Sequence, residues 1–141
     1  MEWSFRGDQP IYTQLVEKIR MGIVSGVYAP GERLASVRDL ALEAGVNPNT
    51  MQRALQELER EGMVYSQRTS GRFVTEDLRV IANMKKRFAE EQIESFLKAM
   101  GKLGFEKKEI LALLKDAIFE GTKMEQMNAV SIEKEEENGD I

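Results

Sequence analysis

The chain has 141 residues, enough for one domain or for one domain with an appendage, and it contains neither cysteine nor histidine. This composition excludes a disulfide framework, a thiolate or histidine metal site, and catalysis by a cysteine nucleophile or a histidine base. We therefore expect no cofactor and no metal. The net charge of −4 gives no overall basic signature for nucleic acid. It resides in residues 129–141, which carry five acidic side chains and one lysine, so the rest of the chain is neutral.

No targeting signal is visible in the sequence. The first residues lack the basic segment and apolar run of a signal peptide, and no apolar run approaches the ~18 residues that a membrane-spanning helix needs. These features predict a cytoplasmic protein with no membrane partner.

Apolar periodicity predicts the first helix. From Ile11 to Ile23 an apolar residue recurs at every fourth position, which indicates a helix over about 10–24 with a proline in its first turn. Asp8 or Gln9 would cap this helix.

Capping residues delimit two further helices. A short helix is expected between Ser36, which suits an N-cap, and Gly45, which suits a C-terminal stop. Another helix begins at Asn47, continues through Pro48 in its first turn, and ends before Gly62. Two short helices joined by a tight turn are typical of the helix-turn-helix motif.

A β-hairpin is predicted directly after these helices. Its strands lie at about 63–67 and 72–75, and a turn at 69–71 joins them. A hairpin in this place is the wing of a winged helix-turn-helix, so residues 1–76 are expected to form a DNA-binding domain. The predicted fold class is mainly α with a small β-hairpin.

The remainder is predicted to be helical up to an acidic tail. Residues 77–128 contain no proline and keep apolar residues at three-to-four spacing, with an interruption around 101–104. We expect two helices, beginning at Asp77 and at about Glu106. Residues 129–141 are charged and poor in apolar side chains, which predicts disorder.

The third helix carries the side chains that point to a function. If Met51, Leu55 and Leu58 face the core, its outward face near the N-terminus is polar. That face consists of Asn49, Thr50, Gln52, Arg53 and Gln56. Arginine suits guanine, asparagine and glutamine suit adenine, and threonine suits a thymine methyl group or a phosphate. An exposed helix face is polar in any case, so composition alone leaves DNA reading and a plain solvated surface both open.

Six segments match, in order and spacing, the motifs of a known family. They are PIYTQL at 10–15, GVYAPGERL at 26–34, SVRDLA at 36–41, VNPNTMQRAL at 46–55, LEREG at 58–62 and SGRFV at 70–74. Residues 9–75 therefore resemble the DNA-binding domain of GntR-family regulators. Two positions depart from the family: Ala35 stands where proline is usual, and Arg72 stands where a second glycine with threonine is common.

The resemblance implies which residues contact DNA. Arg38 matches an arginine that contacts DNA in the family, and Gly71 matches a wing-tip glycine that approaches the minor groove. With the recognition-helix region and the nearby arginines, the expected DNA-binding residues are Arg33, Ser36, Arg38, Asn47, Asn49, Thr50, Gln52, Arg53, Arg68, Ser70, Gly71 and Arg72.

Structural roles compete with several of these assignments. Ser36 and Asn47 suit helix caps better than base readers, and Arg60 can simply pair with Glu57 or Glu61. The aromatic residues fit packing better than base stacking: Tyr12, Tyr28, Tyr65 and Phe73.

The two C-terminal helices carry apolar stripes that they cannot both bury alone. Antiparallel packing plus a second subunit is the natural arrangement, since most soluble oligomers are twofold dimers. The alternative is that the helices only fold back on the winged domain. The expected dimerisation residues are Ile81, Phe88, Ile93, Phe96, Leu97, Met100, Ile110, Leu113, Leu114 and Ile118.

About 65 residues follow the wing, fewer than the large C-terminal domains of many family members require. This length resembles the YtrA subfamily, whose short helical region serves dimerisation and whose members commonly control transporter operons that include their own gene. The resemblance implies a dimeric repressor on an inverted-repeat, double-stranded DNA operator, with the recognition helix in the major groove and the wing at the minor groove. A small-molecule effector of unidentified chemistry stays open.

Two other function classes are weighed against this one. A helical adaptor whose winged helix binds protein is compatible with the acidic balance of the chain. An enzyme has little support, because no catalytic motif groups the many carboxylates and lysines. We predict that the protein is not an enzyme.

Overall fold

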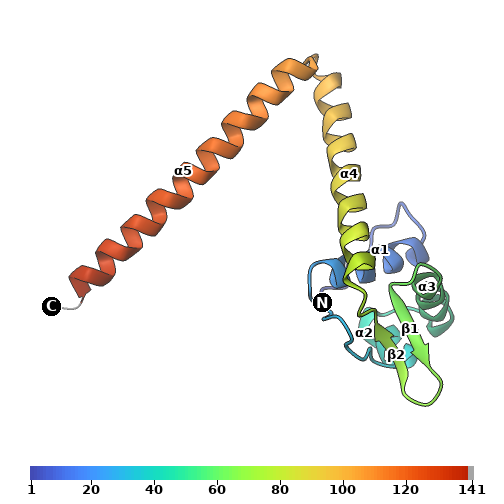
Figure 1. Ribbon diagram of the computed structural model, residues 1–141. Helices are drawn as coiled ribbons and strands as arrows, with labels where there is room; N and C mark the ends of the chain where they lie inside the picture. The colour runs from blue at the N-terminus through green and yellow to red at the C-terminus, as the bar shows by residue number, and fades with distance from the viewer. Residues whose placement is uncertain (140–141) are drawn as a thin grey trace. The chain divides into compact units, whose positions relative to one another are not determined.

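In the computed structural model the backbone is described for residues 1–139 and the side chains for residues 1–130. The chain divides into two compact units, Met1–Glu90 and Glu91–Ile141. The elements follow one another along the chain (Figure 1) as α1 (Ile11–Val24), α2 (Val37–Ala44), α3 (Pro48–Arg60), β1 (Val64–Gln67), β2 (Gly71–Val74), α4 (Leu78–Lys102) and α5 (Lys107–Gly139). No helix in this described part combines the length and apolarity needed to cross a membrane.

The helix α3 is the centre of the first unit, where it packs against α1, α2 and β1. Its inward face and that of α1 are buried as the apolar spacing predicts: Leu15, Ile19, Met51 and Leu55 are at most 1% exposed. Burial of each such side chain contributes about 1.5–3 kcal/mol. This apolar contact therefore fixes α3 on its scaffold and leaves its other face to solvent.

Local capping sets the turn between α2 and α3. Ser36 Oγ accepts a hydrogen bond from the backbone N–H of Asp39 at 3.1 Å. Asn47 Oδ1 accepts one from the backbone N–H of Asn49 at 2.8 Å, so both predicted N-caps are confirmed. Gly45 between them has a φ of +70°, in the left-handed region that favours glycine. It ends α2 and turns the chain into α3.

The start of α1 differs from the sequence prediction. Pro10 occupies the N-cap position, and among the described side chains none caps it, neither Asp8 nor Gln9. Instead Gln14 folds back over the N-terminal segment, and its Nε2 donates to the carbonyl oxygens of Arg6 at 2.8 Å and Gln9 at 2.9 Å. The amide satisfies loop carbonyls that would otherwise lack partners.

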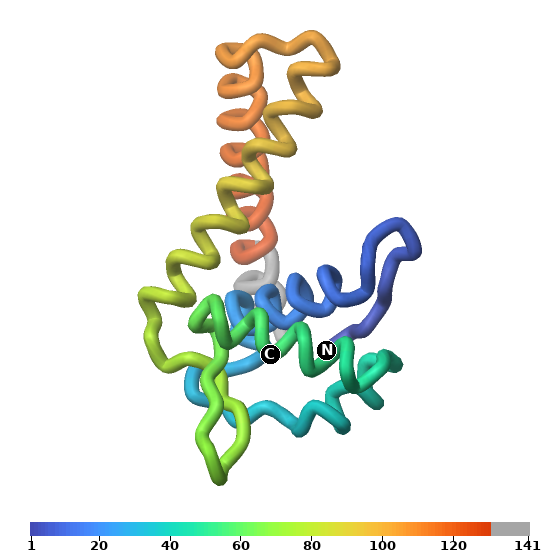
Figure 2. The backbone as a smooth tube through the Cα atoms, turned by 90° about the vertical axis from the view of Figure 1, so that its right-hand side faces the viewer, coloured from blue at the N-terminus to red at the C-terminus, as the bar shows by residue number. Residues whose placement is uncertain are grey.

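The hairpin of β1 and β2 is antiparallel, as predicted, and it projects from the helices (Figures 1 and 2). The segment before α2 adds to its base. Arg33 pairs with Phe73, and the N–H of Leu34 donates to the carbonyl oxygen of Arg72 at 2.9 Å. The base of the wing is therefore tied to the chain that leads into α2.

The first turns of α4 belong to the first unit. Asp77, the predicted first residue, caps the helix through its carboxylate. Met84 is buried, and Ile81 and Phe88 pack against the winged-domain core. The domain boundary that the sequence placed after residue 76 therefore lies inside α4, because the apolar face of these turns covers the winged domain.

The second unit contains the end of α4 and all of α5. The helices are joined through residues 103–106, near the predicted interruption, where the N–H of Phe105 donates to the carbonyl oxygen of Met100 at 3.2 Å. Where the sequence predicts a disordered segment over 129–141, α5 continues to Gly139, and residues 140–141 lie outside the described part. This segment is rich in glutamate and contains no proline, which favours helix despite its lack of apolar side chains.

Candidate nucleic-acid interface

The N-terminal half of α3 presents a polar face to solvent. Asn49 and Arg53 are exposed, while Thr50 and Gln52 are half-buried. Met51 is fully buried on the opposite side and fixes the rotation of the helix. The structure therefore brings these four predicted contacts to one face of the helix-turn-helix, the face on which a recognition helix reads base edges.

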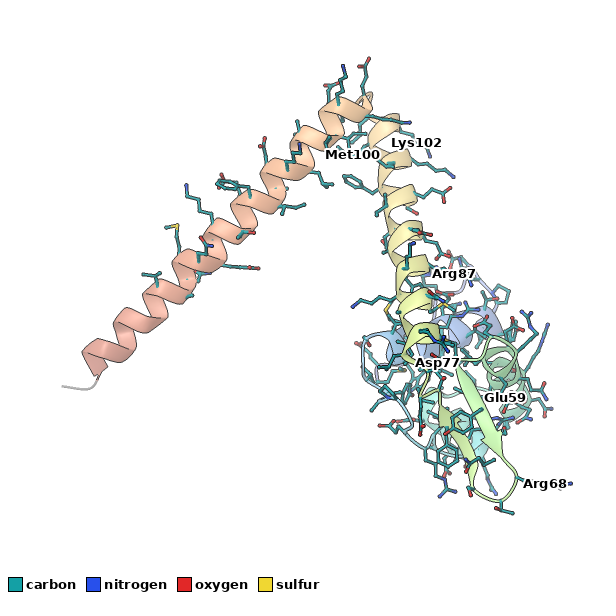
Figure 3. The ribbon with its side chains drawn as sticks, viewed as in Figure 1. Glu59, Arg68, Asp77, Arg87, Met100 and Lys102 are labelled. Carbon is teal, nitrogen blue, oxygen red and sulfur yellow. The ribbon has the colours of Figure 1, made fainter. Side chains whose placement is uncertain are left out.

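Four of the five arginines predicted to bind DNA are exposed and have no acidic partner. Among the side chains of residues 1–130, no carboxylate forms an ion pair with them. They are Arg33, Arg38, Arg53 and Arg68. Figure 3 shows Arg68 at the tip of the hairpin, directed away from the domain. Most arginines elsewhere in this unit pair with glutamate or aspartate, as Arg20 and Arg79 do, although Arg87 of α4 does not. Most of the unpaired arginines of this unit thus lie where phosphates would lie.

Arg53 is held by an aromatic ring of α1. Its Cζ lies over the ring of Tyr12, 4.2 Å from the centroid. Stacking on a ring face leaves the N–H edges of the guanidinium free to donate. Tyr12 also packs against the core, so the expected packing role is confirmed, and it presents Arg53 as well. Sequence reasoning missed this second role, for which the only signal is an aromatic residue in the first turn of the helix that crosses α3.

The wing meets the start of α2 through Gly71 and Arg33. Gly71 has a φ of +105°, and a Cβ at this position would lie 3.3 Å from Arg33 Nε. A hollow of about 240 Å³ opens here, lined by Arg33, Ser36 and Gly71 among others. Ser70, next to Gly71, is half-buried. The structure therefore brings together the predicted contacts of the wing and of the second helix.

Arg72 is placed differently from the other arginines. Its side chain is 18% exposed and its Nε donates to Glu59 Oε1 at 3.0 Å. Its Nη1 donates to Gln52 Oε1 at 3.4 Å. Arg72, which the sequence predicts to contact DNA, therefore lies between the hairpin and α3. Glu59, labelled in Figure 3, was not predicted at all.

Hydrogen bonding keeps Glu59 ionised. Burial alone raises the pKa of this carboxyl, but hydrogen bonds from Ser66 and Arg72, with the charge of Arg72, outweigh burial and lower the pKa. The sequence does contain a signal: Gln52 and Glu59 are seven residues apart and so share one face of α3. What the sequence lacks is the direction in which the hairpin turns Arg72.

The remaining structural readings are confirmed. Arg60 Nε donates to Glu57 Oε2 at 3.0 Å, and this hydrogen bond lowers the pKa of Glu57. The rings of Tyr65 and Phe73 stack on one another with centroids 5.6 Å apart. Ser36 and Asn47 use their side-chain oxygens as caps, so what they can offer DNA is mainly the free N–H groups of a helix N-terminus.

The residues predicted to form a dimer interface fall into two groups. Ile81 and Phe88 contact the winged-domain core, because the first turns of α4 cover that core. The others lie in the second unit, where Ile110 is the one buried residue among the described positions 91–130.

An apolar groove of about 660 Å³ lies in the second unit, beside the connection of α4 and α5. Ile93, Phe96 and Leu97 line it from α4, and Ile110 and Leu114 line it from α5. Contacts between the two helices are few in the described residues. Further along, α5 leaves its apolar side chains exposed, and those of the predicted set are Leu113 and Ile118. Met100, also predicted, is half-buried.

Comparison with known proteins identifies the family. The family model "Bacterial regulatory proteins, gntR family" matches residues 11–74. The HTH-type transcriptional regulator YhcF of Bacillus subtilis is 37% identical over 82% of this chain and 95% of its own length. The chain belongs to the GntR family. A GntR regulator from Listeria monocytogenes, whose structure is solved, is 42% identical with a TM-score of 0.73, covering 79% of this chain and 98% of that one.

The similarity to GntR regulators continues beyond the winged domain. The HTH-type transcriptional repressor YtrA of Bacillus subtilis is 32% identical over 87% of this chain and 82% of its own length. The predicted resemblance to YtrA-type regulators is therefore confirmed. GntR proteins are DNA-binding regulators of transcription and not enzymes. This excludes the enzyme and favours DNA binding over the adaptor.

Proposed function

We propose that this GntR regulator is a homodimeric repressor that binds an inverted-repeat DNA operator. One copy of α3 enters the major groove at each half-site, the wing follows the minor groove, and the half-sites lie about 10 bp apart. The observation that carries this proposal is the set of unpaired, exposed arginines around the N-terminal face of α3. Arg38 and Arg53 contribute most of the base discrimination. The winged domain of residues 1–76, with the first turns of α4 packed on its core, reads DNA, and the remaining helical residues up to 128 serve dimerisation.

Repression and the target genes are proposed from the similarity to YtrA. YtrA is a transcriptional repressor, and YtrA-type regulators commonly act on transporter operons that include their own gene. The proposed setting is the cytoplasm, with double-stranded DNA and a second copy of the chain as partners. Any small-molecule effector would bind in a pocket formed between subunits.

Gel-shift titration of the operator tests the DNA-contact assignment. Arg38→Ala and Arg53→Ala should each weaken binding by about 1–3 kcal/mol and relax base preference at one position per half-site. Arg79→Ala is the matched control, because it removes an exposed arginine that pairs with Asp77 outside the proposed interface. If the two variants bind as tightly as Arg79→Ala does, the assignment is wrong.

The apolar groove of the second unit supports the dimer. Its lining residues Ile93 and Leu114 are 56% and 40% exposed, and exposed apolar patches of this kind mark interaction surfaces. A second copy of the same helices covers them, as in an isologous twofold interface. Because one copy of α3 covers only one half-site, a dimer also explains how an inverted repeat is read.

Sedimentation equilibrium tests the dimer. Ile93→Glu places a charge in the groove and should convert the dimer to a monomer at micromolar concentration. Leu78→Glu is the matched control, since Leu78 is 67% exposed at the start of α4, outside the groove. A dimer that survives Ile93→Glu, or that both variants disrupt equally, contradicts this interface.

A further inference from the structure

The contact between the wing and α3 has a consequence for base preference. Ser66 and Arg72 are cross-strand partners in the hairpin, and both hydrogen-bond to Glu59 of α3. The ionised carboxylate therefore holds the guanidinium by its Nε and fixes the direction of the remaining N–H groups. One of them, on Nη1, donates to Gln52 Oε1.

The chemistry of the two groups determines the orientation of the Gln52 amide. A guanidinium carries only donors, so the atom of Gln52 that faces it must be the carbonyl oxygen. The NH₂ group of Gln52 then points to the other side of the amide. At 3.4 Å the hydrogen bond is long, so its effect is to orient the side chain more than to stabilise the fold.

We propose that Arg72 is a positioning residue for base specificity, which presents Gln52 to DNA as a hydrogen-bond donor. The proposal rests on the proposed function, in which this face of α3 lies in the major groove. A free glutamine reads adenine with both its oxygen and its nitrogen, accepting from N6 and donating to N7. With its oxygen directed at Arg72, Gln52 turns its NH₂ group to the bases and instead favours base edges that offer acceptors: guanine N7 and O6, or thymine O4.

This assignment also explains what Arg72 does at its unusual position. The family commonly has a small residue there, which could not reach α3. In this chain the arginine is engaged with Glu59 and Gln52, and the unpaired Arg68 at the hairpin tip remains for the DNA backbone. Wing and recognition helix therefore act as one unit in reading the base that faces Gln52.

The test is selection of bound duplexes from a randomised library by the full chain and its variants. Gln52→Ala should relax the preference at one base pair of the half-site. That base pair is then the one that Gln52 reads. Arg72→Lys keeps the charge but loses the fork that reaches both partners, and Glu59→Gln removes the charged anchor. Both should relax preference at the same base pair by about tenfold, or about 1.4 kcal/mol. Preference is a ratio of affinities for two duplexes, so a smaller folded fraction in a variant cancels.

Arg68→Ala is the matched control, since it removes an arginine of the same hairpin that does not contact Gln52. It should weaken binding to all duplexes and leave preference at that base pair unchanged. The proposal is overturned if Arg72→Lys selects as the wild type does, if Arg68→Ala relaxes the same base pair, or if the wild type selects adenine there. If Gln52→Ala selects as the wild type does, the proposal is overturned while the proposed function stands; if the wild type enriches no sequence, the proposed function fails as well.

Discussion

The stacking of Arg53 on Tyr12 can be separated from the contact that Arg53 makes with DNA. Tyr12→Leu keeps an apolar side chain against the core but removes the ring that lies 4.2 Å from Arg53 Cζ. A cation–π contact at an exposed site is worth about 0.5–1 kcal/mol. If this energy serves to hold Arg53 in its binding position, Tyr12→Leu should raise the operator Kd by about 2- to 5-fold.

Removing Arg53 itself should cost more. Arg53→Ala loses the base contact, about 1–3 kcal/mol, and adding Tyr12→Leu to it should change little further. Fluorescence anisotropy with a labelled operator at fixed salt concentration measures all three variants, and denaturant unfolding separates affinity from stability. Tyr12→Phe is the control, because it retains the ring face and should bind as the wild type does. Additive effects of the two substitutions, or a Tyr12→Phe variant as weak as Tyr12→Leu, would refute the coupling.

Three further predictions concern stability. Gly71→Ala places a Cβ at a φ of +105° and 3.3 Å from Arg33 Nε, so it should destabilise the winged domain by about 1–3 kcal/mol in denaturant unfolding; an unchanged midpoint would contradict the strain. Glu59 has a lowered pKa in the fold, so the stability that it contributes is present above its ordinary value of 4.5 and is lost as the pH falls through the lower folded value. The wild type should therefore lose more stability below pH 4.5 than Glu59→Gln does. If the free energy of unfolding depends on pH in the same way for both proteins, the pairing of Glu59 with Arg72 contributes nothing to stability. Arg20→Ala breaks the ion pair with Glu61 that joins α1 to the end of α3 and should lower the free energy of unfolding by about 2 kcal/mol. If Arg79→Ala lowers it equally, the loss does not depend on the ion pair with Glu61.

Local signals predict the helix-turn-helix well. Ser36, Gly45 and Asn47 act on backbone groups within three residues of themselves, so their effect can be read directly from the sequence. The same rule failed at α1, because Gln14 and the loop before it form non-adjacent hydrogen bonds that no capping pattern describes.

Periodicity predicts an apolar face but not what covers it. Ile81 and Ile93 belong to one continuous stripe of α4, yet the winged-domain core covers Ile81 while Ile93 lines the groove of the second unit. The choice depends on where the hairpin delivers the chain to α4, which is a property of the folded domain. For the same reason the pairing of Arg72 with Glu59 could not be predicted from spacing alone.

The proposed function depends above all on two copies of α3 reading an inverted repeat. Recovery of bound fragments from genomic DNA at moderate salt concentration tests this, because the operator sequence need not be known before the experiment. We expect enrichment of a sequence with two inverted half-sites about 10 bp apart. Enrichment of a single unrepeated site, of direct repeats, or of no sequence at all would contradict the proposed mode of binding.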